Sequence, residues 1–402
     1  MGSRYYVSTA KTTRGRQAEY VYDEGSVTSA VSMNITIDAT SLLLPSAGVK
    51  TYVHYWLSSL LEASNRHGDN ISTYPPAISV EGVPDHLRVF HRDLRLLLVQ
   101  FCNIRGNPFP RLLLGGADVI HASQHMANMP RRRKVSATVF DFSCWTSPED
   151  HTAENVTATK RYGEKILKAC EGLIAISSHT RNDAIEILGI PGERIRVIYP
   201  GVSQGFFEVT PEQITRVRTR HWLDSPYLFF VGCIEPRKRV PMLVRAYRGL
   251  PESIRRAVQL VISGPMGWKN QVVQPMLRDG GPHIRYLGYV PESDLPGLLG
   301  GATALVYPSR YEGFGLPVAQ ALAAGVPVIT SNCSSLPEVT GDAGLLVDGD
   351  SEEELTDAME RVIRCSDLAR DLASRGKERA KLFRWPECAR QSLEFFREVA
   401  GL

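Results

Sequence analysis

The sequence predicts an α/β protein with two domains, each built on a parallel sheet that helices cover. The chain has 402 residues, which is too long for one ordinary hydrophobic core. Apolar strand-like runs alternate with helical stretches from residue 33, and a second series of this kind starts at residue 227. The clearest unit spans residues 302–330, where a strand, a glycine loop, a helix and another strand follow one another. Loops in such units lie at the carboxyl ends of the strands, where open α/β sheets bind ligands.

The composition is that of an ordinary globular protein, with 43% hydrophobic and 22% charged residues. The 46 basic and 43 acidic residues give a net charge of +3, which makes no case for nucleic acid as a partner. The seven cysteines are dispersed and form no Cys-x-x-Cys pair, so a reducing cytoplasm fits best. No apolar run approaches the roughly 18 residues of a membrane span, and residues 1–32 lack the apolar segment of a signal peptide.

In the first half, residues 1–32 form a polar tail, and the first domain is expected over residues 33–205. Ser177 stands between a strand and a helix, where it can act as the N-cap of the helix. A stretch rich in arginine and leucine, 86–111, favours a surface helix with a buried leucine face over one that rests on an acceptor or a membrane. The expected strands are 33–38, 117–121, 134–141 and 172–177, and the expected helices start at 52, 154 and 179.

In the second half, residues 206–224 are expected to link the domains, and the second domain spans residues 225–385. Gly325 follows an alanine-rich helix as a left-handed C-terminal cap would. The expected strands are 227–232, 258–264, 284–290, 302–307 and 326–330.

The glycine loop after the strand 302–307 has the features of a ligand site. Gly313 and Gly315 let the backbone approach a ligand, and the unpaired N–H groups of residues 314–317 attract anions at the helix start, although Pro317 leaves one donor fewer. Glu312 would repel a phosphate, so it is better explained as an acceptor for hydroxyl groups. A sugar attached to a diphosphate has both an anionic part for the N–H groups and hydroxyl groups for Glu312.

A second loop with the chemistry of a phosphate site follows the strand 227–232. Arg237, Lys238 and Arg239 come after this strand and before a helix, which is where cations meet a phosphate in α/β proteins. The alternative is a solvated basic loop. We favour the phosphate site because this loop and the glycine loop, which are independent signals in the sequence, would then bind the same anion.

Two stretches, 312–317 (Glu-Gly-Phe-Gly-Leu-Pro) and 321–328 (Ala-Leu-Ala-Ala-Gly-Val-Pro-Val), resemble the signature of glycosyltransferase family 4. These are retaining enzymes of the GT-B fold, in which two Rossmann-like, doubly wound parallel-sheet domains face a central cleft. The resemblance covers about residues 33–402. It implies that the last helix, 386–402, packs on the first domain.

The resemblance also implies roles for single residues. Glu312 would hold hydroxyls of the donor sugar, Lys238 would bind the donor diphosphate with Arg237 beside it, and Asp141 would face the acceptor or be merely structural. The loop 44–50, with Gly48, would face the diphosphate across the cleft. The other donor-binding positions implied are Ser177, Gly232, Tyr289, Phe314, Gly315, Leu316 and Gln320.

The chain departs from the family pattern at three positions. Gln320 stands where the family has a second glutamate for the nucleotide ribose, which predicts weakened rather than abolished binding. Phe140 replaces a histidine that touches the donor sugar, and an aromatic ring cannot hydrogen-bond a hydroxyl. Cys233 stands where many relatives have an arginine, for which Arg237 or Arg239 could substitute.

The resemblance implies a hexosyl transfer from a nucleotide-diphospho-sugar to a saccharide or lipid-linked saccharide, without cofactor or metal. Residues 235–238 resemble those of bacterial mannosyltransferases of polysaccharide assembly, which favours GDP-mannose as donor. The enzyme would be cytoplasmic, with peripheral contact to the inner membrane face through the first domain left open. The alternatives are a degenerate nucleotide-sugar-binding protein and a GT-B epimerase or phosphorylase.

Two patterns that imitate metal sites are better explained otherwise. His121 and His125 are four residues apart, but no third ligand accompanies them, so a cleft-lining role for the pair is expected. Asp348 and Asp350 precede a glutamate-rich helix start, where capping is favoured over metal binding.

Overall fold

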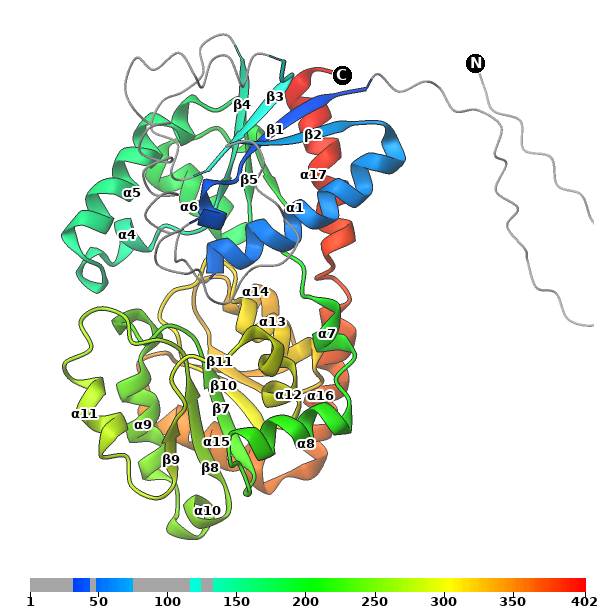
Figure 1. The fold of residues 1–402 in the computed structure, drawn as a ribbon. Coiled ribbons are helices and arrows are strands. Elements are labelled where there is room, and N and C mark those ends of the chain that lie inside the picture. The colour runs from blue at the N-terminus through cyan, green and yellow to red at the C-terminus, as the bar shows by residue number, and fades with distance from the viewer. Residues whose placement is uncertain (1–31, 44–47, 75–115, 124–132) are drawn as a thin grey trace, which may run out of the picture. The chain divides into compact units, whose positions relative to one another are not determined.

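The computed structural model describes residues 32–43, 48–74, 116–123 and 133–402, and this part of the chain contains two six-stranded parallel sheets (Figure 1). Each sheet is doubly wound, because its strand order reverses direction next to its first strand. The α/β class with two parallel-sheet halves, expected from the sequence, is confirmed. The predicted segment 86–111 lies outside the described residues.

The first sheet has the order β2-β1-β3-β4-β5-β6. Its register places Ile35 opposite both Ile71 and Val119. Burial on both faces explains why most of these strands are short apolar runs. The strands are β1 (Asn34–Asp38), β2 (Asn70–Tyr74), β3 (Val119–Ala122), β4 (Lys134–Val139), β5 (Gly172–Ala175) and β6 (Ile195–Val197).

The second sheet has the order β12-β11-β10-β7-β8-β9. Its two central strands, β7 (Tyr227–Val231) and β10 (Ala304–Tyr307), pair directly, so the loops that follow them leave the same edge side by side. The other strands are β8 (Gln259–Ser263), β9 (Ile284–Tyr286), β11 (Val328–Ser331) and β12 (Gly344–Val347).

Helices connect the strands of both sheets. In the first half they are α1 (Gly48–His67), α4 (Ser143–Thr146), α5 (Ala153–Lys165) and α6 (Ser178–Leu188). In the second half they are α7 (Gln204–Phe207), α8 (Pro211–Arg220), α9 (Val240–Gly249), α10 (Glu252–Ala257), α11 (Val273–Arg278), α12 (Leu295–Gly300), α13 (Leu316–Ala323), α14 (Leu336–Thr340), α15 (Glu352–Arg364), α16 (Ser366–Ala380) and α17 (Trp385–Ala400). No helix in the described ranges is long and apolar enough to cross a membrane.

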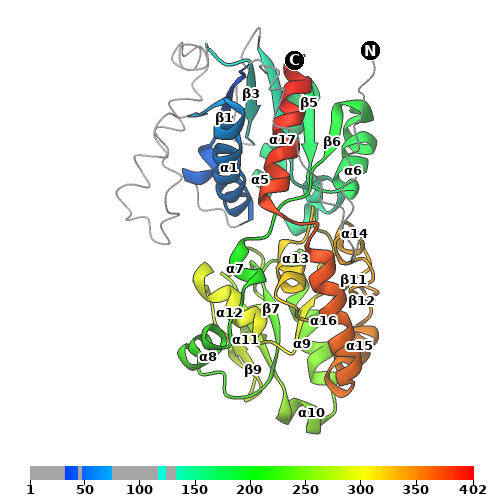
Figure 2. The ribbon, with the colours of Figure 1, turned by 90° about the vertical axis from the view of Figure 1, so that its right-hand side faces the viewer.

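The last helix, α17, packs on α1 in the upper half of Figure 2. It also contacts β3 and β4. Trp56 of α1 donates a hydrogen bond from its indole nitrogen to the Ser392 hydroxyl of α17 at 3.0 Å, in a buried contact. The C-terminal end of the chain therefore stabilises the first sheet, as the family resemblance implies.

The segment expected to be a linker, 206–224, contains the helix α8, which packs on α12. Thr210 and Gln213 form a capping box at its start, because the side chain of each accepts a hydrogen bond from the backbone of the other. Part of the predicted linker is therefore packed against the second half.

His121 does not line a cleft, contrary to the sequence expectation. It lies in β3, is 4% exposed, and shares hydrogen bonds of 2.9 Å with the hydroxyls of Ser136 and Thr138. Burial lowers its pKa to about 3, so the ring is a neutral part of the core. His125 lies outside the described residues.

Candidate functional site

The loops that follow β7 and β10 meet at a buried group of charged side chains. Lys238 forms an ion pair through its Nζ atom with Oε1 of Glu312, and Nη1 of Arg237 lies 3.0 Å from Oε2 of the same carboxylate. All three side chains are at most 12% exposed. The prediction that these two loops come together is confirmed, although 74 residues separate Lys238 from Glu312.

Further hydrogen bonds hold the Glu312 carboxylate in place. The hydroxyl of Ser309 donates to Oε1 at 2.6 Å and that of Tyr307 at 3.0 Å. Burial alone would raise the pKa of Glu312, but Arg237 and Lys238 outweigh it and hold the pKa at about 2. Glu312 is therefore a carboxylate anion at every physiological pH.

The two cations of the cluster differ in how burial affects them. Burial and the neighbouring Arg237 lower the pKa of Lys238, although Glu312 opposes the shift. Burial disfavours the charge of Arg237 as well, but Glu312 and Glu235 raise its pKa. Nη2 of Arg237 lies 2.6 Å from Oε1 of Glu235. Two carboxylates thus balance two cations in a site with little access to water.

The glycine loop is held against the first half of the chain. A Cβ atom on Gly313 would lie 1.7 Å from the carbonyl oxygen of Phe140, so only glycine fits there. Gly315 has a φ of +96° and is the N-cap of α13. Phe314 is buried and packs on the rings of Tyr199 and Phe383. Residues 312–316 are therefore fixed in position by packing on both sides.

Asp141 lies beside this glycine loop. Its Cβ atom is 3.1 Å from the position that a Cβ of Gly313 would occupy. Its carboxylate accepts hydrogen bonds from the backbone N–H of Ser143 at 3.1 Å and from the Ser143 hydroxyl at 2.7 Å. The ring of Phe140 packs edge-on against Tyr52 at 5.1 Å. Asp141 is thus close to the cluster, while Phe140 turns its side chain toward the apolar core.

Ser177 is the N-cap of α6 and is fully buried. Its hydroxyl accepts from the backbone N–H of Thr180 at 3.0 Å and lies 2.9 Å from the Thr180 hydroxyl. Of the two roles that the sequence left open, this geometry supports capping.

The remaining predicted donor positions lie in loops that follow strands or in the first turns of helices. Gly232 follows β7 with a φ of +156°, and a Cβ there would lie 3.9 Å from Cε of Lys238. Tyr289 follows β9 and is 56% exposed. Gly48 is the exposed first residue of α1, next to residues 44–47, which lie outside the described ranges. Leu316 and Gln320 are half-buried in the first two turns of α13.

Tyr311 and Glu338 make contacts that the sequence did not predict. The hydroxyl of Tyr311 donates to the carboxylate of Asp183 and accepts from the backbone N–H of Phe142 at 3.1 Å. The carbonyl of Tyr311 accepts from Arg237. Tyr311 therefore connects the cluster to residues of the first half. Its place next to Glu312 was the available signal.

Glu338 of α14 accepts hydrogen bonds at the start of α6. The backbone N–H groups of Ser178 and His179 donate to its two oxygens at 2.7 and 3.2 Å, and the Tyr199 hydroxyl donates at 2.9 Å. A carboxylate at a helix N-terminus is favoured by the helix dipole. No sequence pattern indicated this long-range contact.

Within the described ranges, no group of three or more His, Cys, Asp or Glu side chains is arranged to hold a metal ion.

The prediction that Asp348 and Asp350 cap the following helix is wrong, because another residue is its N-cap. Ser351 is the N-cap of α15, while Asp348 accepts from the N–H of Asp350 at 2.9 Å and Asp350 pairs with Arg239.

Comparison with protein-family models and curated proteins identifies the family. The model described as Glycosyltransferase Family 4 matches residues 48–205, and the model described as Glycosyl transferases group 1 matches residues 212–379. The O-antigen chain mannosyltransferase B of Escherichia coli is 34% identical over 274 residues, which are 67% of this chain and 72% of that protein. This chain belongs to glycosyltransferase family 4.

Other relatives of this glycosyltransferase match over smaller shares. A D-inositol 3-phosphate glycosyltransferase from a Nocardioides strain is 32% identical over 254 residues, 59% of this chain and 55% of that protein. The serotype-specific mannosyltransferase WbdA of Escherichia coli is 25% identical over 234 residues, 56% of this chain and 28% of that protein.

Solved structures confirm the GT-B fold of this glycosyltransferase. HepE of Anabaena, crystallised with UDP and glucose, has a TM-score of 0.65 at 18% identity and covers 90% of this chain and 98% of its own. WaaG, a glycosyltransferase involved in lipopolysaccharide biosynthesis, has a TM-score of 0.63 at 19% identity and covers 88% of this chain and 97% of its own. At these identities the likeness concerns the fold alone.

Proposed function

We propose that this glycosyltransferase transfers a mannosyl group from GDP-mannose to a saccharide or lipid-linked saccharide acceptor, with retention of configuration. The observation that carries the proposal is the meeting of Lys238 and Arg237 with Glu312 at the carboxyl ends of β7 and β10. The mannosyl group and the role in polysaccharide assembly are supported by relatives whose names describe mannosyltransferases.

The donor fits the charges of this cluster. The diphosphate is bound by Lys238 and Arg237 together with the free N–H groups at the start of α13, and Glu312 accepts hydrogen bonds from the hydroxyls of the sugar. The donor phosphates then compete with Glu312 for the two cations.

The transfer needs no protein nucleophile. The bond between the anomeric carbon and the diphosphate oxygen breaks, and its electron pair stays on that oxygen. The acceptor hydroxyl attacks the same face of the carbon, and its proton moves to an oxygen of the departing phosphate. Lys238 and Arg237 stabilise the negative charge that develops on the leaving group. Asp141, which lies beside Gly313, faces the acceptor.

The other predicted contacts complete the donor site in this proposal. Gly48 and Gly232 allow the backbone to approach the diphosphate, Phe314, Gly315 and Leu316 present the N–H groups of the α13 start, and Gln320 binds the ribose. The backbone next to Tyr289 meets the base. No metal or other cofactor takes part, because the two cations supply the charge that a metal ion otherwise provides. Peripheral membrane contact through the first half remains part of the proposal.

Nucleotide titration tests the donor. At a hundred times its dissociation constant, GDP should raise the free energy of unfolding by about 2.7 kcal/mol. We expect UDP and ADP to raise it less at the same concentration. Thermal-shift measurements with and without EDTA should agree, because the site needs no metal. A larger shift with UDP would contradict the choice of GDP-mannose, and a shift that EDTA abolishes would contradict metal independence.

Turnover measurements with GDP-mannose and an acceptor test the roles of the cluster. Lys238→Met keeps the length of the side chain without its charge, and Glu312→Gln keeps the shape of the carboxylate. We expect each to lower kcat by about a hundredfold to a thousandfold. Lys381→Met, at a lysine that is 63% exposed, is the control and should leave kcat unchanged.

The outcome of these assays also separates the rival functions. Near-normal turnover in either variant would refute the site. Donor binding without any transfer in the wild-type protein would favour a nucleotide-sugar-binding protein. Reaction without an acceptor, or only with inorganic phosphate, would indicate an epimerase or a phosphorylase.

A further inference from the structure

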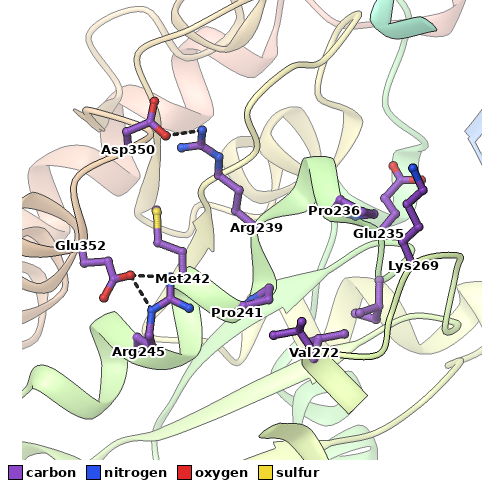
Figure 3. A pocket seen from close by; sticks show the side chains of 12 residues that line it. Glu235, Pro236, Arg239, Pro241, Met242, Arg245, Lys269, Val272, Asp350 and Glu352 are labelled. Carbon is purple, nitrogen blue, oxygen red and sulfur yellow. Dashed lines mark hydrogen bonds and ion pairs between the residues drawn. The ribbon is translucent and has the colours of Figure 1, made fainter. Parts of the chain in front are cut away.

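A pocket of about 420 Å³ lies next to the charged cluster and shares Glu235 with it (Figure 3). Its walls come from the loop after β7, the first turns of α9, the loop before α11 and the start of α15. Lys238 and Glu312 do not line it. The pocket is therefore a separate feature of the second half, and the donor site proposed above does not explain it.

The charges of the pocket cancel. Three cations and three carboxylates line it, and Figure 3 shows two of the ion pairs that they form. Nη2 of Arg245 lies 2.5 Å from Oε1 of Glu352, and Arg239 forms an ion pair with Asp350. A strongly charged ligand would have to break these pairs. A neutral ligand whose groups both donate and accept hydrogen bonds can use them as they are.

The rest of the lining is apolar and partly open to solvent. Val272 is 66% exposed, although it stands on the pocket wall with Pro236, Pro241 and Met242. Apolar carbon of this kind favours a ligand with apolar faces, because covering it removes it from water. Pockets that bind small molecules combine such walls with a few polar groups.

We propose that this pocket is a second saccharide-binding site, which holds part of the acceptor chain away from the reacting end. A saccharide is neutral, each of its hydroxyls donates and accepts, and its ring C–H faces are apolar. These properties match the paired charges and the apolar wall. The proposal rests on the proposed function, because it takes the acceptor to be a saccharide.

The position of the pocket, beside the charged cluster, fits a part of the acceptor that lies beyond its reacting end. Glu235 lines the pocket and pairs at 2.6 Å with Arg237, which in turn lies 3.0 Å from Glu312. Lys269, which also lines the pocket, donates to the carbonyl of Glu149 in the first half. The pocket therefore lies beside the loop that carries the cations of the proposed donor site.

Binding of α-linked mannotriose, measured by calorimetry on the full chain, tests the proposal. Val272→Trp fills the mouth of the pocket. We expect this change to weaken mannotriose binding at least tenfold while the thermal shift caused by GDP stays as in the wild type. Leu382→Trp, at a leucine that is 52% exposed and does not line the pocket, is the matched control and should bind mannotriose normally.

The outcomes distinguish this site from the donor site. If the wild-type protein responds to GDP but mannotriose does not bind, the second site is refuted and the proposed function stands. If mannotriose binds equally to the wild type and to Val272→Trp, the sugar lies elsewhere and the proposal also fails. If GDP produces no shift, the proposed function fails, whereas the mannotriose result still decides whether the pocket binds saccharides.

Discussion

Replacing Glu312 by glutamine perturbs the charged cluster most directly. The amide has nearly the shape of the carboxylate and can still accept hydrogen bonds from Ser309 and Tyr307. It removes the negative charge that lies between Arg237 and Lys238. Removing one partner of a buried ion pair costs about 3–5 kcal/mol, because the other charge stays buried without compensation.

The pKa of Glu312 gives an independent magnitude. Burial raises this pKa, but Arg237 and Lys238 lower it from 4.5 to about 2. At about 1.36 kcal/mol for each pH unit, the difference corresponds to about 3 kcal/mol of folding free energy. The folded-state pKa is below the unfolded one, so this contribution is complete above about pH 5 and is lost as the pH falls toward 2. At pH 3, less than half of it should remain.

Urea unfolding of wild type and Glu312→Gln at pH 7, 5, 4 and 3 measures this effect. We expect the variant to be less stable by about 3 kcal/mol at pH 7, with a difference that shrinks below pH 4. Glu387→Gln is the control. Hydrogen bonds from Arg390 lower the pKa of Glu387 to about 2 as well, but its side chain is 44% exposed, so water screens the pair. A difference below about 1 kcal/mol for Glu312→Gln, or one that does not change with pH, would refute the reasoning.

Three further predictions concern residues around the cluster. Tyr311→Phe removes the hydroxyl between Asp183 and Phe142, so we expect the free energy of unfolding to fall by about 1–3 kcal/mol. We also expect a lower kcat with unchanged GDP binding, and equal kcat in the variant and the wild type would exclude a positioning role for Tyr311. The free energy of unfolding of His121→Asn should depend less on pH than that of the wild type. Burial holds the pKa of His121 at about 3, so the wild type loses about 2 kcal/mol of this free energy as the pH falls from 7.5 to 5 and the unfolded state gains a proton. Equal losses in the two proteins, measured by urea unfolding at both pH values, would contradict this. Glu338→Ala should speed amide hydrogen exchange at the start of α6, whose N–H groups it frees, and unchanged exchange there would disprove the contact.

Local signals explain why the sequence predicted the glycine loop so well. Gly315 adopts a left-handed φ of +96° and Pro317 stands in the first turn of α13, and both residue types are typical of these places. Gly325 likewise has a φ of +68° at the end of that helix. Such preferences act over a few residues and can be recognised without knowledge of the fold.

The elements that the sequence missed lack such signals or carry them in polar residues. The strand β2, Asn70–Tyr74, has partly exposed polar side chains and lies in a stretch without a clear period. The helix α8 was included in a linker because its exposed face is rich in arginine and threonine. Its capping box, Thr210 with Gln213, was the available signal.

The sequence by itself determined the two-domain α/β class, the positions of the loops that carry Lys238 and Glu312, and the family. The tertiary structure alone decided that these two side chains form a buried ion pair, that His121 lies in the core and that a neutral pocket opens beside the cluster. The physical reason is distance along the chain. Turn and helix preferences are local, whereas burial, pairing and the pKa shifts that they cause depend on residues that only the folded chain brings together.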